Sequence, residues 1–192
     1  MKVLFMHIPK TAGSSLLSSE LGAVIDKRIH SFVGEIDDII KEYCAEDYFK
    51  FCFTRNPYDR FCSLYYYFKN MTPEHMFYKY NGSILKLVKR YETFEDFCLA
   101  FPDLNIKNFH FYSQSKYMFS NGSQIVDYIG KMENLNEDVA DLCNKLGVVQ
   151  TKQIPHSNKS NTVDYRDVYS NKMRKVVEDA YEEDIKRLGY TF

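Results

Sequence analysis

The chain has 192 residues with a formal net charge of −1. This length fits one domain with a substantial buried core, so a single domain over residues 1–192 is expected. The near-neutral charge excludes a general attraction to nucleic acid or to an acidic membrane surface, and any anion site must be built locally.

The lengths of the apolar runs and the pattern of cysteines indicate where in the cell the protein resides. No apolar run approaches the roughly 20 residues that span a bilayer, and the N-terminus reads as a strand and not as a signal peptide. The five cysteines form no C-x-x-C pair and read as reduced, mostly buried thiols. We therefore expect no stable membrane insertion and a cytoplasmic location.

The predicted elements alternate between strands and helices. Short runs that contain apolar residues predict strands at residues 3–7, 24–29, 48–54 and 125–129, and the run at 48–54 is nearly continuously apolar, as a buried parallel strand would be. Helical spacing of apolar residues predicts helices at residues 14–21, 35–43, 57–70, 84–91, 93–101 and 134–146, and one long final helix that ends at Gly189. This order predicts an α/β fold with a central parallel sheet flanked by helices in three layers, similar to P-loop proteins, with a ligand crevice at the carboxyl ends of the strands.

The first strand runs into a turn of small and polar residues. This turn is His7-Ile8-Pro9-Lys10-Thr11-Ala12-Gly13-Ser14-Ser15. Backbone N–H groups, the helix dipole, the lysine and three hydroxyls suit a phosphate or a phosphosulfate. Lys10 precedes the turn's glycine, so the pattern differs from the G-x-x-x-x-G-K-[ST] loop of ATP and GTP sites.

A second strand, turn and helix follow at residues 51–65. Pro57 suits the first turn of a helix. Arg55 would end the strand and Ser63 would lie about two helical turns further on, so a guanidinium and a hydroxyl could converge on a second phosphate.

The two stretches together resemble a known enzyme family. The letters I-P-K-T-A-G-S-S and R-N-P-Y-D-R-F-x-S are similar to those of sulfotransferases that use 3′-phosphoadenosine-5′-phosphosulfate (PAPS). Within those enzymes, the two motifs most resemble the carbohydrate branch, sulfotransferase family 2, which includes heparan and chondroitin enzymes and bacterial relatives. Weaker likenesses at residues 132–135, at residues 156–160 and in the final D-x-x-x-L-G-Y extend the resemblance over nearly the whole chain.

The resemblance implies roles for the two motifs. Lys10, Thr11, Ala12, Gly13, Ser14 and Ser15 would hold the 5′-phosphosulfate, and Arg55 and Ser63 would hold the 3′-phosphate. Sulfuryl transfer needs a base, positive charge at the leaving phosphate and in-line placement, and it requires no metal. Lys10 is the candidate for the leaving-group charge.

The candidate base is His30, which ends the second strand. The family's 2-O-sulfotransferases carry a catalytic histidine in a comparable place, and an imidazole with a pKa near neutrality suits deprotonation of a sugar hydroxyl. Other members use a glutamate, which leaves Glu35 and Glu20 as alternatives. His110 and His156 are candidates for contact with the acceptor substrate.

The sequence thus predicts a sulfotransferase that moves a sulfuryl group from PAPS to a hydroxyl, in the first place of a carbohydrate, and releases 3′,5′-adenosine bisphosphate (PAP). Two other classes stay open: a P-loop-type kinase, which would require magnesium and ATP, and a non-catalytic nucleotide- or glycan-binding module. The resemblance would place the chain in the Golgi lumen only if an N-terminal anchor had been removed. The acceptor and the oligomeric state are not determined by the sequence.

Overall fold

The computed structural model describes residues 1–30, 38, 47–154 and 164–192. The chain divides into two compact units. Met1–Arg55 and Tyr112–Lys159 form the first unit, and Asn56–Phe111 and Ser160–Phe192 form the second. The expected helix at residues 35–43 lies almost wholly outside the described residues.

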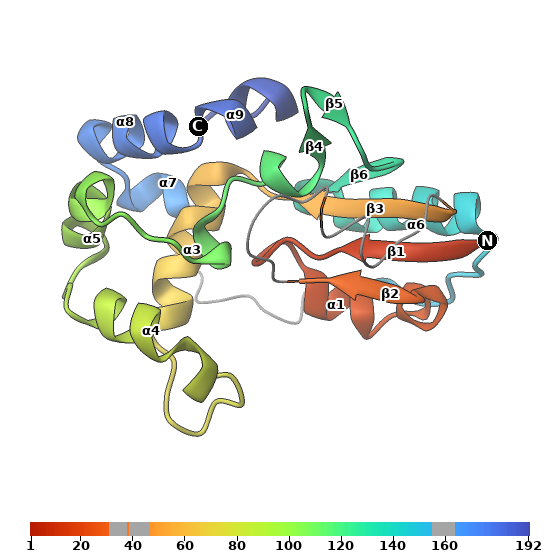
Figure 1. Cartoon of the computed structure of the whole chain (residues 1–192), viewed down its shortest axis with the longest axis horizontal. Coiled ribbons are helices and arrows are strands. Elements are labelled where there is room, and N and C mark those ends of the chain that lie inside the picture. The colour runs from red at the N-terminus through yellow and green to blue at the C-terminus, as the bar shows by residue number, and fades with distance from the viewer. Residues whose placement is uncertain (31–37, 39–46, 155–163) are drawn as a thin grey trace. The chain divides into compact units, whose positions relative to one another are not determined.

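The first unit is built on a parallel sheet. Its strands are β1 (Lys2–Met6), β2 (Lys27–Ile29), β3 (Tyr48–Thr54) and β6 (Tyr128–Lys131), in the order β2-β1-β3-β6. Every neighbouring pair is parallel, and the arrows of β1, β2 and β3 point the same way in Figure 1. The predicted α/β fold with a central parallel sheet flanked by helices is confirmed.

One face of this sheet carries the core of the first unit. Aromatic side chains alternate along the strands, so Phe5 and Phe51 share a face and stack with ring centroids 4.9 Å apart. The same core contains residues of α1 (Gly13–Leu17), η1 (Glu20–Val24) and α6 (Leu135–Leu146). Gly130 in β6 admits the Phe53 ring, because a Cβ there would lie 2.4 Å from that ring.

The first helix is shorter than predicted. The hydroxyls of Ser18 and Ser19 donate to the carbonyls of Ser15 and Leu16 at 3.0 and 2.6 Å. Such local bonds compete with the helical pattern, so α1 ends at Leu17 and η1 occupies the start of the strand expected at residues 24–29.

The strand expected at residues 125–129 is also displaced. A hairpin of β4 (Phe119–Ser120) and β5 (Ser123–Gln124) precedes β6, which begins at residue 128. Asn121 and Gly122 join the two hairpin strands with φ of 48° and 81°, the conformation of the tight turns that match strand twist. Short 3₁₀ helices η5 (Ser115–Tyr117) and η6 (Met132–Asn134) complete this unit.

The second unit is helical. It contains α3 (Pro57–Lys69), η2 (Lys79–Asn81), α4 (Gly82–Lys89), α5 (Phe94–Ala100), η3 (Phe101–Asp103), η4 (Phe109–Phe111), α7 (Tyr165–Val168), α8 (Asn171–Ala180) and α9 (Glu182–Leu188). The predicted start of α3 is confirmed: Pro57 is its first residue, and the Asn56 side chain accepts from the Tyr58 N–H at 3.1 Å.

Aromatic packing organises this unit. The Phe61 ring lies 4.8 to 6.2 Å from the rings of Phe101, Phe97, Tyr181 and Phe111. The Tyr181 hydroxyl donates to the Phe111 carbonyl at 3.0 Å. Tyr181 leaves helical geometry, with φ −125° and ψ 29°, and the prediction of one long final helix is wrong because the chain breaks there between α8 and α9.

Arg60 is buried although it carries a charge, and only 1% of it is exposed. Its Nη2 donates to the carbonyl of His110 at 2.7 Å, so the guanidinium is part of the interior of the second unit.

Two further sequence expectations concern cysteines and membranes. Cys52, Cys62, Cys98 and Cys143 are buried free thiols, as predicted, whereas Cys44 lies outside the described residues. Among the helices that the structure describes, none combines the length and the apolar composition needed to cross a bilayer.

Candidate active site

The carboxyl ends of three neighbouring strands gather most of the predicted site residues. The turn at residues 7–15 follows β1, His30 follows β2, and Arg55 follows β3. Because β1 pairs in parallel with both neighbours, these segments leave the sheet at the same edge. The His7 N–H donates to the Ile29 carbonyl at 2.8 Å, which continues the pairing of β1 and β2 into the turn.

The turn after β1 has an unusual backbone. Lys10 and Ala12 adopt φ of 69° and 66°, the left-handed region that residues other than glycine rarely enter. The Thr11 hydroxyl is fully buried and donates to the Ile8 carbonyl at 2.9 Å, which closes the turn. Left-handed residues within a turn direct N–H groups into anion-binding concavities, and strained backbone of this kind gathers at functional sites.

The helix dipole contributes less here than the sequence suggested. α1 has only five residues, and its N-cap, Ala12, has no side chain that could cap it. Since the Thr11 hydroxyl proton is held within the turn, Thr11 could offer a ligand only its backbone N–H. The expected anion site would therefore rest on backbone N–H groups, on Lys10 and on the hydroxyls of Ser14 and Ser15.

His7 lies among the candidate site residues, although sequence reasoning gave it no role of its own. The residue is 9% exposed, and its ring stacks on Phe5 at 5.0 Å and lies 4.3 Å from the His30 ring. A Cβ at position 13 would lie 1.8 Å from His7 Nε2, so the turn requires glycine there. His7 thus packs against both the turn and His30.

The structure brings Lys10 and Arg55 together. Arg55 Nη1 donates to the Lys10 carbonyl at 3.3 Å. Burial, and secondarily the positive charge of Arg55, lower the pKa of Lys10 to about 8. Two cations at one strand edge are costly by themselves, and an anion between them would relieve that cost.

The backbone of Arg55 has a partner that the sequence did not reveal. The side chain of Gln114 bonds both the N–H and the C=O of Arg55, at 2.9 and 2.8 Å. The two residues are 59 positions apart, and no local pattern could have connected them.

His30 is part-buried beside this turn. Burial, and secondarily the charge of Arg28, lower the pKa of His30 to about 4. The expectation of a pKa near neutrality is therefore wrong for the ligand-free protein, because the imidazole is desolvated and faces a cation. His30 is neutral at physiological pH, the form that can accept a proton.

The alternative carboxylates are placed differently. Glu20 is an exposed carboxylate that accepts from the Thr151 N–H at 3.3 Å and from the Thr151 hydroxyl. The side-chain hydrogen bond from Thr151 is the first cause that lowers the pKa of Glu20. Glu35 lies outside the described residues.

Ser63 lies in the second unit on α3. It is 4% exposed, and its Oγ is buried with no hydrogen-bond partner among the described residues. A buried hydroxyl in a helix ordinarily bonds back to a carbonyl of the preceding turn. The Ser63 hydroxyl is therefore not committed to a carbonyl of the described residues.

His110 is held in one tautomer within the second unit. The Asn108 side-chain oxygen accepts from the His110 backbone N–H at 3.0 Å and lies 2.8 Å from Nδ1. Nδ1 must therefore carry the proton, and Nε2 is the accepting nitrogen. The ring is 5% exposed and contacts Phe68 and Phe109, and a role in acceptor binding stays a prediction. His156 lies outside the described residues.

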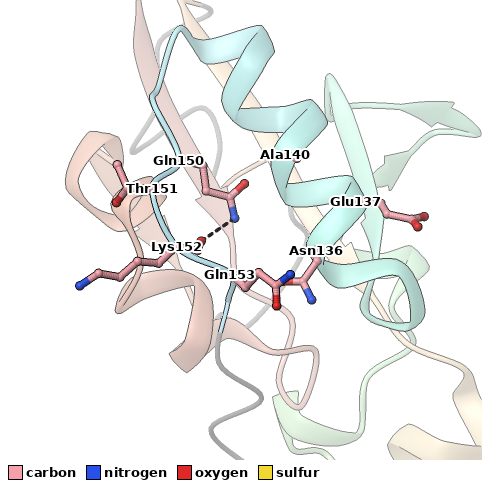
Figure 2. Close-up of a pocket in the computed structure, with 7 residues that line it drawn as sticks. All are labelled: Asn136, Glu137, Ala140, Gln150, Thr151, Lys152 and Gln153. Atoms are coloured by element: carbon pink, nitrogen blue, oxygen red, sulfur yellow. Dashed lines mark hydrogen bonds between the residues drawn. The ribbon is translucent and has the colours of Figure 1, made fainter.

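A surface hollow of about 410 Å³ lies elsewhere in the first unit. Figure 2 shows its lining at the start of α6 and along the segment that follows that helix. The lining residues are Asn136, Glu137, Ala140, Gln150, Thr151, Lys152 and Gln153. No predicted site residue lines this hollow. Among the described residues, no group of three His, Cys, Asp or Glu side chains is arranged to hold a metal ion.

Fold and site define an α/β protein with a cationic strand-turn-helix at the carboxyl edge of a parallel sheet. The chain belongs to the sulfotransferase family 2 type, since the model of the Sulfotransferase family matches residues 23–191. The match includes His30, Arg55 and Ser63, and the turn after β1 precedes it. Members of this family transfer sulfuryl groups, which leaves the kinase alternative without support.

Comparison with curated proteins and with solved structures does not identify a substrate. An uncharacterised protein of Archaeoglobus fulgidus is 32% identical over 103 residues, which cover 54% of this chain and 71% of that protein. No solved structure matches the chain.

Proposed function

We propose that this chain transfers a sulfuryl group from PAPS to a hydroxyl, with a carbohydrate as the first acceptor class, and releases PAP. The observation that carries the proposal is the pairing of Lys10 and Arg55 at the carboxyl edge of the sheet. In a chain of the sulfotransferase family, this cationic pair beside a turn with left-handed residues suits a nucleotide that carries several phosphate charges.

The donor roles follow from charge and position. Backbone N–H groups of residues 10–15 would bind the 5′-phosphosulfate, with Ser14 and Ser15 adding hydroxyls. Lys10 would offset the charge that develops on the oxygen bridging sulfur and phosphorus. Arg55 would bind the 3′-phosphate through its planar fork of donors. Ser63 is proposed as a second donor to that phosphate, because of its motif and its buried hydroxyl.

The transfer itself exchanges one sulfur–oxygen bond for another. The acceptor oxygen forms a bond to sulfur as the bond from sulfur to the 5′-phosphate oxygen breaks, and PAP leaves with that electron pair. His30 would take the hydroxyl proton through a ring nitrogen, since it is neutral at physiological pH. The negative donor would raise the pKa of His30 from its ligand-free value and so strengthen it as a base.

Calorimetric titration tests the donor site. We expect PAP to bind without metal and more tightly than ADP or ATP with magnesium, and Arg55→Ala to abolish this preference. Arg187→Ala is the matched control, because it removes the same charge from an exposed pair with Glu183 at 2.9 Å. Stronger binding of ATP with magnesium, or unchanged PAP binding by Arg55→Ala, would contradict the proposal.

Turnover separates an enzyme from a binding module. Purified chain with PAPS and a panel of mono- and oligosaccharides should release PAP, and His30→Ala should bind PAP normally yet lose release at least 100-fold. A wild-type chain that binds PAP but releases none with any acceptor would favour the non-catalytic module.

A further inference from the structure

The side-chain amide of Gln114 hydrogen-bonds both the N–H and the C=O of Arg55. Gln114 Oε1 accepts from the Arg55 N–H at 2.9 Å, and Nε2 donates to the Arg55 carbonyl at 2.8 Å. Gln114 is fully buried, and both residues belong to the first unit. The amide orientation is fixed, because exchanging its oxygen and nitrogen would set donor against donor at one end and acceptor against acceptor at the other.

This contact lies where β3 ends and the hydrogen bonds between neighbouring strands stop. β3 ends at Thr54, whose partner in β6 is Lys131, and Arg55 is the next residue. Buried or part-buried peptide groups require partners. The Gln114 amide supplies the pair of bonds that a further residue of a neighbouring strand would otherwise provide.

Fixing the two peptide groups on either side of the Arg55 Cα also fixes the direction in which its side chain leaves the backbone. The direction of the Cα–Cβ bond follows from the backbone dihedrals, and Arg55 Nη1 then reaches the Lys10 carbonyl at 3.3 Å. We infer that Gln114 is a positioning residue that aims the Arg55 guanidinium at the phosphate of the donor. This inference rests on the proposed function, because it gives Arg55 a nucleotide phosphate to bind.

A double-mutant cycle tests the inference. The dissociation constant of PAP is measured by calorimetry for the wild-type chain, Gln114→Met, Arg55→Ala and the double variant. We expect Gln114→Met to raise the dissociation constant about tenfold when Arg55 is present, and less than about twofold when it is absent. Gln124→Met is the matched control, since its amide also bonds a backbone carbonyl, that of Val126 at 2.7 Å, and it should leave PAP binding unchanged.

The four dissociation constants distinguish a failure of the Gln114 inference from a failure of the proposed donor site. Equal losses with and without Arg55 would mean that Gln114 serves the fold alone, and an unchanged dissociation constant in Gln114→Met would mean that it serves neither; each overturns the inference while the donor site stands. A wild-type chain that binds no PAP would instead overturn the proposed function, and the inference with it.

A second variant covers a failure to fold. If thermal unfolding shows that Gln114→Met is not folded, Gln114→Asn replaces it in the cycle. Asparagine keeps the amide donor and acceptor on a side chain one methylene shorter, so it cannot hold both bonds to the Arg55 backbone at their present length. We expect the dissociation constant of PAP to rise in the chain that carries Arg55 and to change less than about twofold without Arg55, and equal losses in both would refute the positioning role.

Discussion

If Lys10 binds the donor as proposed, its pKa makes that binding depend on pH in a predictable direction. In the free protein, burial and the charge of Arg55 lower this pKa from 10.5 to about 8. A bound polyanion would return it to its ordinary value or above. Well below pH 8 the amine is already protonated, so binding takes up no proton there; above pH 8 it must take one up, and affinity falls as pH rises.

The size of the effect follows from the two protonation states. At about pH 7.5 roughly three-quarters of Lys10 is protonated in the free protein, and at about pH 9.5 only a few per cent is. The dissociation constant of PAP should therefore rise about 20-fold between these values. The phosphates of PAP contribute little, because their second ionisation, near pH 6, is complete over this range.

Calorimetry in two buffers of different ionisation enthalpy measures both quantities. Proton uptake on binding should approach one at the higher pH and fall to about a quarter at the lower pH. Lys10→Arg is the control, because a guanidinium stays charged throughout and should give a flat profile. A flat profile in the wild-type chain, or a 20-fold change that persists in Lys10→Arg, would refute the placement of Lys10 at the donor phosphates.

Three other changes test the rest of the site. Gly13→Ala drives a methyl group into the imidazole of His7 and should lower the free energy of unfolding by about 1–3 kcal/mol in chemical denaturation; wild-type stability would mean that the turn tolerates a side chain. Ser63→Ala removes a hydroxyl that makes no hydrogen bond to the described residues, so stability should hold while the dissociation constant of PAP rises about tenfold; unchanged binding would remove Ser63 from the donor site. The imidazole of His30 in the protein without donor should become protonated near pH 4 when its titration is followed by NMR, and a midpoint near pH 6.5 would mean that burial and Arg28 do not lower its pKa.

Local patterns were enough to predict the architecture and the edge where the site lies. The apolar run at residues 48–54 and Pro57 shortly beyond it determine β3 and the start of α3 from neighbouring residues alone. Parallel strands place their carboxyl ends together, so the strand pattern alone assigns the turn with Lys10 and the end of β3 with Arg55 to one edge of the sheet.

The tertiary structure decided what surrounds those residues. Contacts between distant parts of the chain give Arg55 its Gln114 partner and desolvate His30, and the folded path of the turn at residues 7–15 forces glycine at position 13 against the His7 ring. No pattern of neighbouring residues records such contacts, because burial and hydrogen bonding depend on which segments the fold brings together. By itself the sequence determined which side chains reach the edge of the sheet; their charge states and the groups that hold them came only from packing.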